Sequence, residues 1–265
     1  MSAPPDRAER LHRVLRAAGE VAWAAWSPHL RPRIKADGTP VTDADLAAEG
    51  EILRGLGAAF PGDCFVTEES GGDPGLGAWW VVDPIDGTSS FVEGLAHWGP
   101  TVARVVRVEG RPVVDCGALW LPRLGEHYHV EAGGPAPGAW FNGRPMVPFA
   151  ARRGAHTAYL PSRFHTHFRL RYPGKARCIG GTAAHLMLTA RGAAELVIVA
   201  PGWSTWDTAA GLALIAVLGG RSALLGSGEP VDPFAHEGQA FVAGTPEVVD
   251  QVLRPGAIQP LVEEP

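Results

Sequence analysis

Two aspartates in the segment WWVVDPIDGTSSF are the residues best suited to act together on a charged ligand. Asp83 and Asp86 are separated only by Pro84 and an isoleucine. Proline restricts the backbone and lacks an N–H, so we expect a sharp turn there that lets the two carboxylates converge. Gly87 would allow a close approach to a ligand, and a helix starting at Thr88 would offer free N–H groups to a phosphate. The motif predicts a divalent cation held between these acids and a phosphate.

A surface turn capped by the two acids is the alternative, and the other acids favour the cation site. Glu68 and Glu69 end a predicted strand, Asp45 lies in the first turn of a predicted helix, and Asp207 stands near the start of another in TWDTAAG. One such acid usually caps a helix, but several beside glycine or threonine suggest a shared site. Packed carboxylates repel, and only cations or protons relieve the repulsion. An all-oxygen site predicts magnesium rather than zinc.

Hydrophobic periodicity and turn residues indicate the elements that would carry these acids. Apolar residues at helical spacing predict a helix over residues 8–26, and Thr42 is a predicted N-cap for a second helix. The run WWVV is typical of a buried strand, which we expect to end at Asp83. In the first 150 residues we also expect a loop or hairpin at 34–42, a flexible loop at 71–77, turns at 109–110 and 141–144, and strands at 63–67, 99–108, 112–121 and 126–130.

After residue 150 the pattern changes to alternating strands and helices, which predicts an α/β fold. We divide the chain into an α+β N-terminal subdomain over residues 1–150, with most metal ligands, and an α/β C-terminal subdomain over residues 151–265 that completes the site. Strands are expected at 157–160, 177–179, 194–199 and 240–244, and helices at 182–191, 206–218 and 246–253.

The order of these motifs resembles the inositol monophosphatase family. That family belongs to the lithium-sensitive, magnesium-dependent phosphatase superfamily, with fructose-1,6-bisphosphatases and bisphosphate nucleotidases. The resemblance runs from about residue 35 to 248 and implies a layered αβαβα sandwich of the sugar-phosphatase type. The matching motifs are Lys35 with Asp37 to Thr42 and Asp45, the pair Glu68-Glu69, DPIDGT at 83–88 with Phe91, GTAA at 181–184 and WDTAAG at 206–211.

The resemblance implies a ligand set for two to three Mg²⁺ ions, with Mn²⁺ as a substitute. Glu68, Asp83 and the main-chain carbonyl of Ile85 would hold the first ion. Asp83, Asp86 and Asp207 would hold the second. Bound metal would lower the pKa of water and polarise the phosphate, so no covalent nucleophile is needed. Asp83 as a phosphorylated nucleophile is the alternative, but an acid shared between metals is poorly available for attack.

The resemblance also implies catalytic and substrate-binding positions. Asp45, with Glu68, would lie near a weaker third ion, and Thr88 together with Asp45 would orient and deprotonate the attacking water. The Gly87 and Thr88 amides would bind phosphate oxygens. The full set of implied substrate positions is Lys35, Gly87, Thr88, Ser89, Gly181, Thr182, Ala183 and Ala200.

Ala200 departs from the pattern of the family's inositol-binding members, which carry a glutamate there that grips substrate hydroxyls. Such contacts decide selectivity. The expected reaction is therefore Mg²⁺-dependent hydrolysis of a small phosphomonoester: an inositol, sugar or polyol phosphate, or histidinol phosphate. One alternative is a nucleotide 3′-phosphatase, which a basic, aromatic pocket near Trp203 would favour; packing under the loop is an equally good role for Trp203. A non-catalytic regulatory binding protein on the same fold is the alternative from another class.

Composition narrows the class of partner. A net charge of −5 over 265 residues argues against a nucleic-acid-binding protein, and no apolar run reaches the length of a membrane span. Charged residues occupy the start, where a signal peptide would be apolar, and the three scattered cysteines fit reduced thiols. We therefore expect a cytoplasmic protein that acts on a small molecule, and the resemblance implies a lithium-sensitive homodimer.

A few other side chains could do chemistry, and for most of them an ordinary surface role is favoured. Histidines two apart, His127 with His129 and His165 with His167, are expected to lie at the surface, the second pair in a loop. The arginines at 163, 169 and 171 are expected to form a solvated basic face rather than a substrate entrance. Ser162 is a candidate substrate contact from the resemblance alone.

Overall fold

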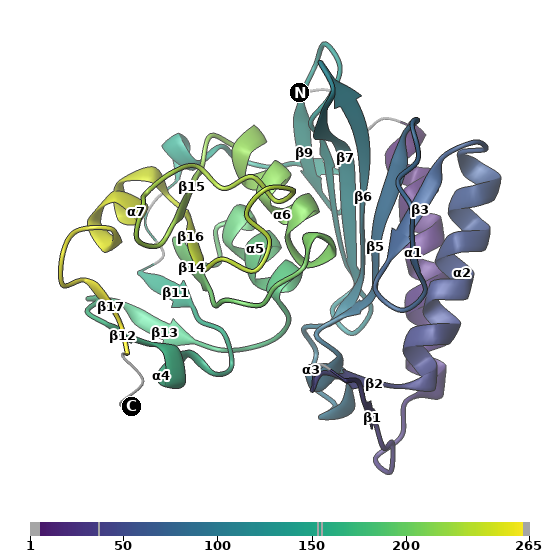
Figure 1. Ribbon diagram of the computed structural model, residues 1–265, viewed down its shortest axis with the longest axis horizontal. Helices are drawn as coiled ribbons and strands as arrows, with labels where there is room; N and C mark the ends of the chain where they lie inside the picture. Colours follow the sequence, from purple (N-terminus) through teal and green to yellow (C-terminus); the bar gives the residue numbers. More distant parts are fainter. Residues whose placement is uncertain (1–5, 37, 153, 155, 262–265) are drawn as a thin grey trace.

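Five alternating layers of helix and sheet make up the fold in the computed structural model, which describes residues 6–36, 38–152, 154 and 156–261 (Figure 1). Helices α1 (Asp6–Ala25) and α2 (Asp43–Ala59) cover the outer face of a large sheet, at the right of Figure 1. Helices α5 (Thr182–Arg191) and α6 (Thr205–Val217) lie between this sheet and a smaller one, and α7 (Pro246–Val252) packs on the smaller sheet's far face. The predicted α/β class and αβαβα layering are confirmed.

The larger sheet has eight strands in the order β10-β9-β8-β7-β6-β5-β3-β4. Only the β3–β5 pair is parallel. Both predicted turns are present, and Asn142 (φ 46°) and Gly143 (φ 74°) have the left-handed conformation that a tight hairpin turn requires. The strands are β3 (Cys64–Thr67), β4 (Gly71–Gly72), β5 (Trp79–Asp86), β6 (Gly99–Val108), β7 (Arg111–Leu121), β8 (Glu126–Glu131), β9 (Gly138–Phe141) and β10 (Arg144–Pro145).

The smaller sheet has five strands in the order β13-β11-β14-β16-β15, of which β13, β11 and β14 run parallel. Its strands are β11 (Thr157–Tyr159), β13 (Lys175–Arg177), β14 (Leu196–Val199), β15 (Arg221–Leu224) and β16 (Phe241–Gly244). Two-stranded ladders join β1 (Arg33–Ile34) to β2 (Pro40–Val41) and β12 (Phe168–Leu170) to β17 (Ile258–Pro260). Sequence patterns missed β12, β15 and β17, which are three or four residues long.

The predicted end of the central strand at Asp83 is wrong. Strand β5 continues through Pro84 to Asp86, with all its residues buried. Its register against β6 shifts between Asp83 and Asp86, so Pro84, which has no N–H to donate, falls at a bulge in the ladder. The chain turns instead at Gly87, whose φ of 85° favours glycine.

Two large apolar clusters hold the layers together. One lies between α1, α2 and the larger sheet, and includes Leu11, Ile52 and Trp80. The other fills the space between the two sheets and joins residues from both halves of the chain, such as Leu119 and Leu186. Each sheet therefore contributes to a shared core, and the division of the chain at residue 150, between β10 and β11, stays a prediction.

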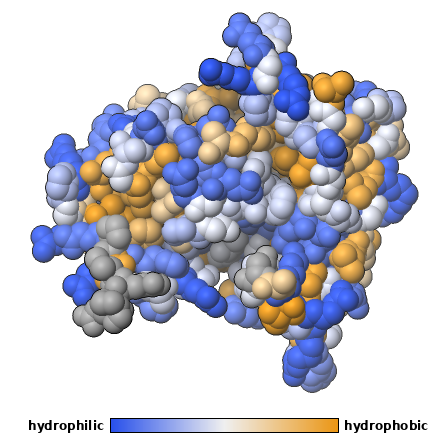
Figure 2. Space-filling view, in the orientation of Figure 1, coloured by the Kyte–Doolittle hydropathy of each residue, from blue (hydrophilic) through white to orange (hydrophobic). Residues whose placement is uncertain are grey.

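Hydrophilic side chains dominate the face seen in Figure 2, where apolar residues form separate patches. Among the described residues, no helix combines the length and apolarity that a membrane crossing needs. Arg163, Arg169 and Arg171 are exposed, as expected of a solvated basic face. His165 and His167 lie in the short helix α4 (Phe164–His167) rather than in a loop, which corrects that expectation.

The expected surface position of His127 and His129 is also wrong. Their side chains lie on β8 with exposed fractions of only 6% and 1%. Residues two apart on a strand share one face, and His12 on α1 stacks on the His127 ring with centroids 4.4 Å apart. Burial, together with neighbouring positive or titratable groups, lowers the pKa of both rings to about 3.

We expect these buried rings to make the fold sensitive to acid. Because their folded-state pKa values lie below the unfolded value of 6.5, the neutral rings favour the fold above pH 6.5, and this stabilisation is lost as pH falls. Between pH 6 and pH 4, the free energy of unfolding of His127→Gln should therefore fall less steeply than that of the wild type, by about 1 kcal/mol per pH unit. Urea unfolding measures this slope. Substitution of the exposed His165 with glutamine should leave the wild-type slope; equal slopes for His127→Gln and wild type would contradict the assignment.

Candidate active site

A cavity of about 530 Å³ opens where β5 ends and where helices α5 and α6 begin. Acids from three separate parts of the chain face it, as predicted: Glu68, the β5 pair Asp83 and Asp86, and Asp207. The predicted positions that line the cavity are Lys35, Glu68, Asp83, Ile85, Asp86, Gly87, Thr88, Ser89, Gly181, Thr182 and Asp207. Asp45, Ala183 and Ala200 are not part of this lining.

Asp86 is fixed by the start of helix α5. Its two carboxylate oxygens accept hydrogen bonds from the backbone N–H groups of Ala183 (3.0 Å) and Ala184 (2.9 Å). The first N–H groups of a helix have no carbonyl partner within the helix, and here the Asp86 side chain, from the larger sheet, accepts their hydrogen bonds. Gly181 precedes the helix, and a Cβ built there would stand 2.3 Å from Asp86 Oδ2. The close approach of strand β5 to helix α5 therefore requires glycine at this position.

Asp207 and Asp83 are held by local backbone contacts. Asp207 is the third residue of α6, and its Oδ2 accepts the N–H of Ser204 at 2.7 Å in a capping box. Asp83 Oδ1 accepts the N–H of Ile85 at 2.9 Å. Because each carboxylate accepts a hydrogen bond from a nearby backbone N–H, the acids are held in place before any ligand is present.

The electrostatics of the cluster favour protons or cations. Burial, reinforced by repulsion from Glu68, Asp86 and Asp207, raises the pKa of Asp83 well above its usual value. Burial raises the pKa of Asp86 to about 7, although the α5 N–H groups oppose the shift. Burial likewise raises the pKa of Asp207 to about 8. Without a cation, these side chains therefore tend to keep their protons near neutral pH.

Lys35 supplies one positive charge at the rim of the cluster. Its Nζ donates to Glu68 Oε1 and to Glu69 Oε1, each at 2.8 Å. Burial alone would lower the pKa of Lys35, but these two hydrogen bonds raise it well above its usual value. Behind the pair, Glu49 on α2 accepts the backbone N–H of Glu69 at 3.0 Å. Asp37, from the same predicted motif, lies outside the described residues.

Thr88 links the cavity to the fully buried Asp45. The hydroxyl of Thr88 lies 3.1 Å from Asp45 Oδ1 and 3.2 Å from the carbonyl oxygen of Ile85. The other oxygen of Asp45 accepts from the backbone N–H (2.8 Å) and hydroxyl (2.7 Å) of Thr42, the predicted N-cap of α2. Burial raises the pKa of Asp45. The Thr88 hydroxyl therefore connects Asp45 to the cavity.

The donor set suits a hard cation, although the acids are not drawn together around a preformed hole. Among the described residues, no three acidic, histidine or cysteine side chains stand at the spacing that would hold a metal ion. The cavity nevertheless offers buried carboxylates and a main-chain carbonyl, which are the ligands that Mg²⁺ prefers. Burial first, and then repulsion from neighbouring acids such as Glu68, raises the pKa values of Asp86 and Asp207. Oxygen donors with excess negative charge fit Mg²⁺.

Some residues that line the cavity were not predicted from the sequence. Ser162 lines the cavity, as the resemblance suggested, and His185 and Ser204 line it as well. Ser204 could have been found as the N-cap of α6, whereas His185 is hidden in an apolar helical pattern.

Trp203 does not form a substrate wall, since its side chain is buried and its indole N–H donates to the Gln239 carbonyl at 2.6 Å. Its neighbour Trp206 lines the cavity instead.

Known proteins resemble this chain over most of its length. A sequence model described as the inositol monophosphatase family matches residues 7–259. A protein named histidinol-phosphatase from Chlorobaculum parvum is 40% identical over 197 residues, 70% of this chain and 73% of the relative. A protein named glucose-1-phosphate thymidylyltransferase from Streptomyces griseus is 32% identical over 220 residues, 79% and 82% of the two chains. The structure of an IMPase from Thermotoga maritima aligns with a TM-score of 0.78 at 24% identity, over 94% of this chain and 96% of the other.

Gly181→Ala tests the contact between β5 and α5. The new methyl group would collide with the Asp86 carboxylate, so Asp86 or the helix must shift. We expect a loss of roughly 1–3 kcal/mol in stability. Thermal unfolding measures it. Gly57→Ala on α2, where a Cβ meets no atom within 4 Å, is the matched control and should stabilise the fold by roughly 0.5–1 kcal/mol. Equal melting temperatures for Gly181→Ala and wild type would show that the contact is not tight.

Proposed function

The chain belongs to the inositol monophosphatase family, and we propose that it is an Mg²⁺-dependent hydrolase of a small phosphomonoester. The observation that carries the proposal is the group of buried acids around one cavity, in which Asp83, Asp86 and Asp207 all have raised pKa values. Burying several carboxylates together costs free energy, and such groups are typical of sites that bind a cation. Lithium sensitivity, a homodimer and a cytoplasmic location belong to the same proposal and rest on family membership alone.

The ligand roles follow the resemblance given by the sequence. Glu68, Asp83 and the Ile85 carbonyl would hold one Mg²⁺, and Asp83, Asp86 and Asp207 a second. Asp45 is completely buried, so its part in a weaker third site would require Glu68 to provide the exposed ligand. When bound, the ions, with Mn²⁺ as a substitute, neutralise the phosphate and make water more acidic.

Thr88 and Asp45 are the residues we propose for proton transfer. The Thr88 hydroxyl can donate to Asp45 Oδ1, and Thr88 itself lines the cavity. A water bonded to the Thr88 oxygen would be oriented for attack. As the water gives a proton to the Thr88 oxygen, the Thr88 hydroxyl proton could pass to Asp45. The pKa of Asp45 is raised by burial, which makes the carboxylate a better proton acceptor.

The substrate preference can be narrowed by what the cavity lacks. Ala200 leaves no acceptor for sugar hydroxyls at that position, and its methyl group does not line the cavity. We therefore propose an amino-alcohol phosphate, histidinol phosphate, ahead of inositol phosphate, in line with the name of the relative from Chlorobaculum. The nucleotide 3′-phosphatase alternative loses its expected support, because Trp203 is buried in packing contacts.

Phosphate release from a panel of phosphomonoesters tests the proposal. With Mg²⁺ we expect release from histidinol phosphate at a higher kcat/KM than from inositol 1-phosphate, and no release after chelation. Asp86→Asn should lower kcat by at least about 100-fold while the protein stays folded, because one ligand is lost. Asp73→Asn, which changes an exposed acid, is the matched control and should keep wild-type activity. Release from no ester with either Mg²⁺ or Mn²⁺ would favour a non-catalytic binding protein.

Thr88→Val separates proton transfer from metal binding. Valine keeps the shape but removes the hydroxyl, so we expect kcat to fall by about 10²–10⁴-fold. The Mg²⁺-induced rise in melting temperature should stay, because the carboxylates are unchanged. Thr88→Ser restores the hydroxyl and should recover most of the activity. Wild-type kcat in Thr88→Val would remove Thr88 from the reaction.

A further inference from the structure

A second cavity, separate from the one that the carboxylates line, lies between α1 and strands β7 to β9. Seven buried side-chain nitrogen or oxygen atoms lack a partner among the described residues, and four of them belong to its lining. They are Nε2 of His12, Nε2 of His127, Nδ1 of His129 and Nε1 of Trp140. The cavity measures about 360 Å³. Buried polar atoms almost always have partners, so this concentration points to a bound species.

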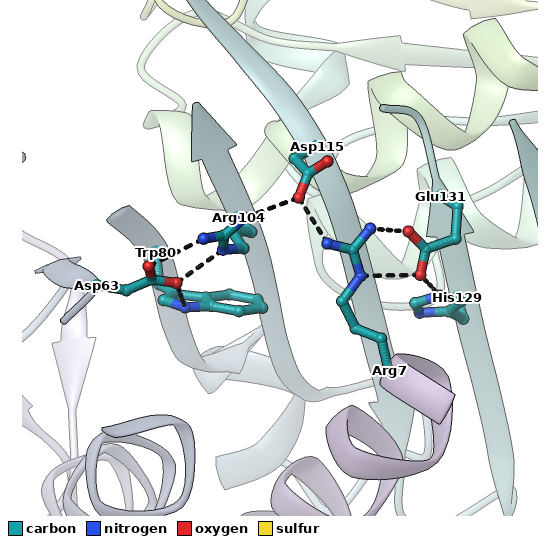
Figure 3. A network of polar contacts seen from close by, with 7 residues as sticks. All are labelled: Arg7, Asp63, Trp80, Arg104, Asp115, His129 and Glu131. Atoms are coloured by element: carbon teal, nitrogen blue, oxygen red, sulfur yellow. Dashed lines mark hydrogen bonds and ion pairs between the residues drawn. The ribbon is translucent and has the colours of Figure 1, made fainter. Parts of the chain in front are cut away.

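The tautomer of His129 is set by an ionic network (Figure 3). His129 Nε2 lies 2.8 Å from Glu131 Oε1, and Arg7 donates to both oxygens of the same carboxylate. Arg7 also pairs with Asp115 at 2.6 Å. Because Glu131 can only accept, Nε2 of His129 carries the proton and Nδ1 keeps a free lone pair. A carboxylate behind an imidazole is the usual support of a metal-ligating histidine.

We propose that His12, His127 and His129 form a binding site for a divalent transition-metal ion of the Zn²⁺ type, separate from the carboxylate cavity. His127 and His129 alternate with Tyr128 on β8 and so project from one face of the sheet, while His12 comes from α1 above them. Three neutral imidazoles are a ligand set for Zn²⁺, Co²⁺, Ni²⁺ or Cu²⁺ and not for Mg²⁺.

The three imidazole rings must rotate before they can bind one metal ion together. His12 lies nearly parallel to His127, with an interplanar angle of 13°, and among the described residues no three such side chains are preassembled around a metal position. Ring lone pairs lie in the ring plane, so parallel rings must tilt to meet at one ion. His12 is only half-buried and lies beside the cavity, so it has the room to rotate. Burial lowers the pKa of all three rings, which leaves their lone pairs available at neutral pH without displacing protons.

Equilibrium dialysis against Zn²⁺ tests the site, using the full chain in millimolar Mg²⁺ so that hard-cation ligands are occupied. We expect the wild type to hold one more equivalent of Zn²⁺ than His12→Gln and His129→Gln, or to bind it at least about 10-fold more tightly. His165→Gln, which changes an exposed histidine, should behave as wild type. A Co²⁺ titration should give the visible absorption of a nitrogen-ligated ion in the wild type only.

The readout is independent of phosphatase activity, because none of the three histidines lines the carboxylate cavity. If His129→Gln fails to fold, His12→Gln decides, since its half-buried side chain is the least disruptive to replace. Equal Zn²⁺ stoichiometry and affinity in wild type and His12→Gln would overturn the proposal and leave ordered water as the partner of the four nitrogens.

Discussion

The active-site region depends on one electrostatic constraint, which is that several carboxylates share a small buried volume. Burial and mutual repulsion raise the pKa of Asp83, Asp86 and Asp207 together. The fold tolerates them because each accepts a hydrogen bond from at least one backbone N–H group and because Lys35 offsets part of the charge. Carboxylates that are costly to bury and are held by backbone contacts favour the binding of a cation, which relieves their mutual repulsion.

The same contacts join the two sheets. Asp86 ends a strand of the larger sheet and accepts the first free N–H groups of α5, the helix between the sheets. The glycine at 181 permits this approach, since any side chain would occupy the position of the carboxylate. The acidic cluster therefore also contributes to the contact between strand β5 and helix α5.

Two polar sites of opposite chemistry stand on the larger sheet. The carboxylate cavity at the end of β5 offers hard oxygen donors and excess negative charge. The histidine cavity on β8 offers neutral nitrogens, whose charge is suppressed by burial. Ligand softness would therefore direct different ions to the two sites. Near each cavity a hydrogen-bonded neighbour fixes one of these side chains: Thr42 contacts Asp45, and Glu131, paired with Arg7, contacts His129 (Figure 3).

The sequence determined the acidic motifs, the family, the layered class and most elements, because periodicity, turn residues and spaced acids are local patterns. It placed Asp83 and Asp86 beside a turn, yet located that turn at Pro84 rather than Gly87, since a bulge depends on the partner strand. Only the tertiary structure decided that Asp45 is buried in contact with Thr88, that Trp206 and not Trp203 reaches the cavity, and that His127 and His129 are buried. Burial depends on which elements cover a face, and contacts between distant segments leave no trace in the local pattern.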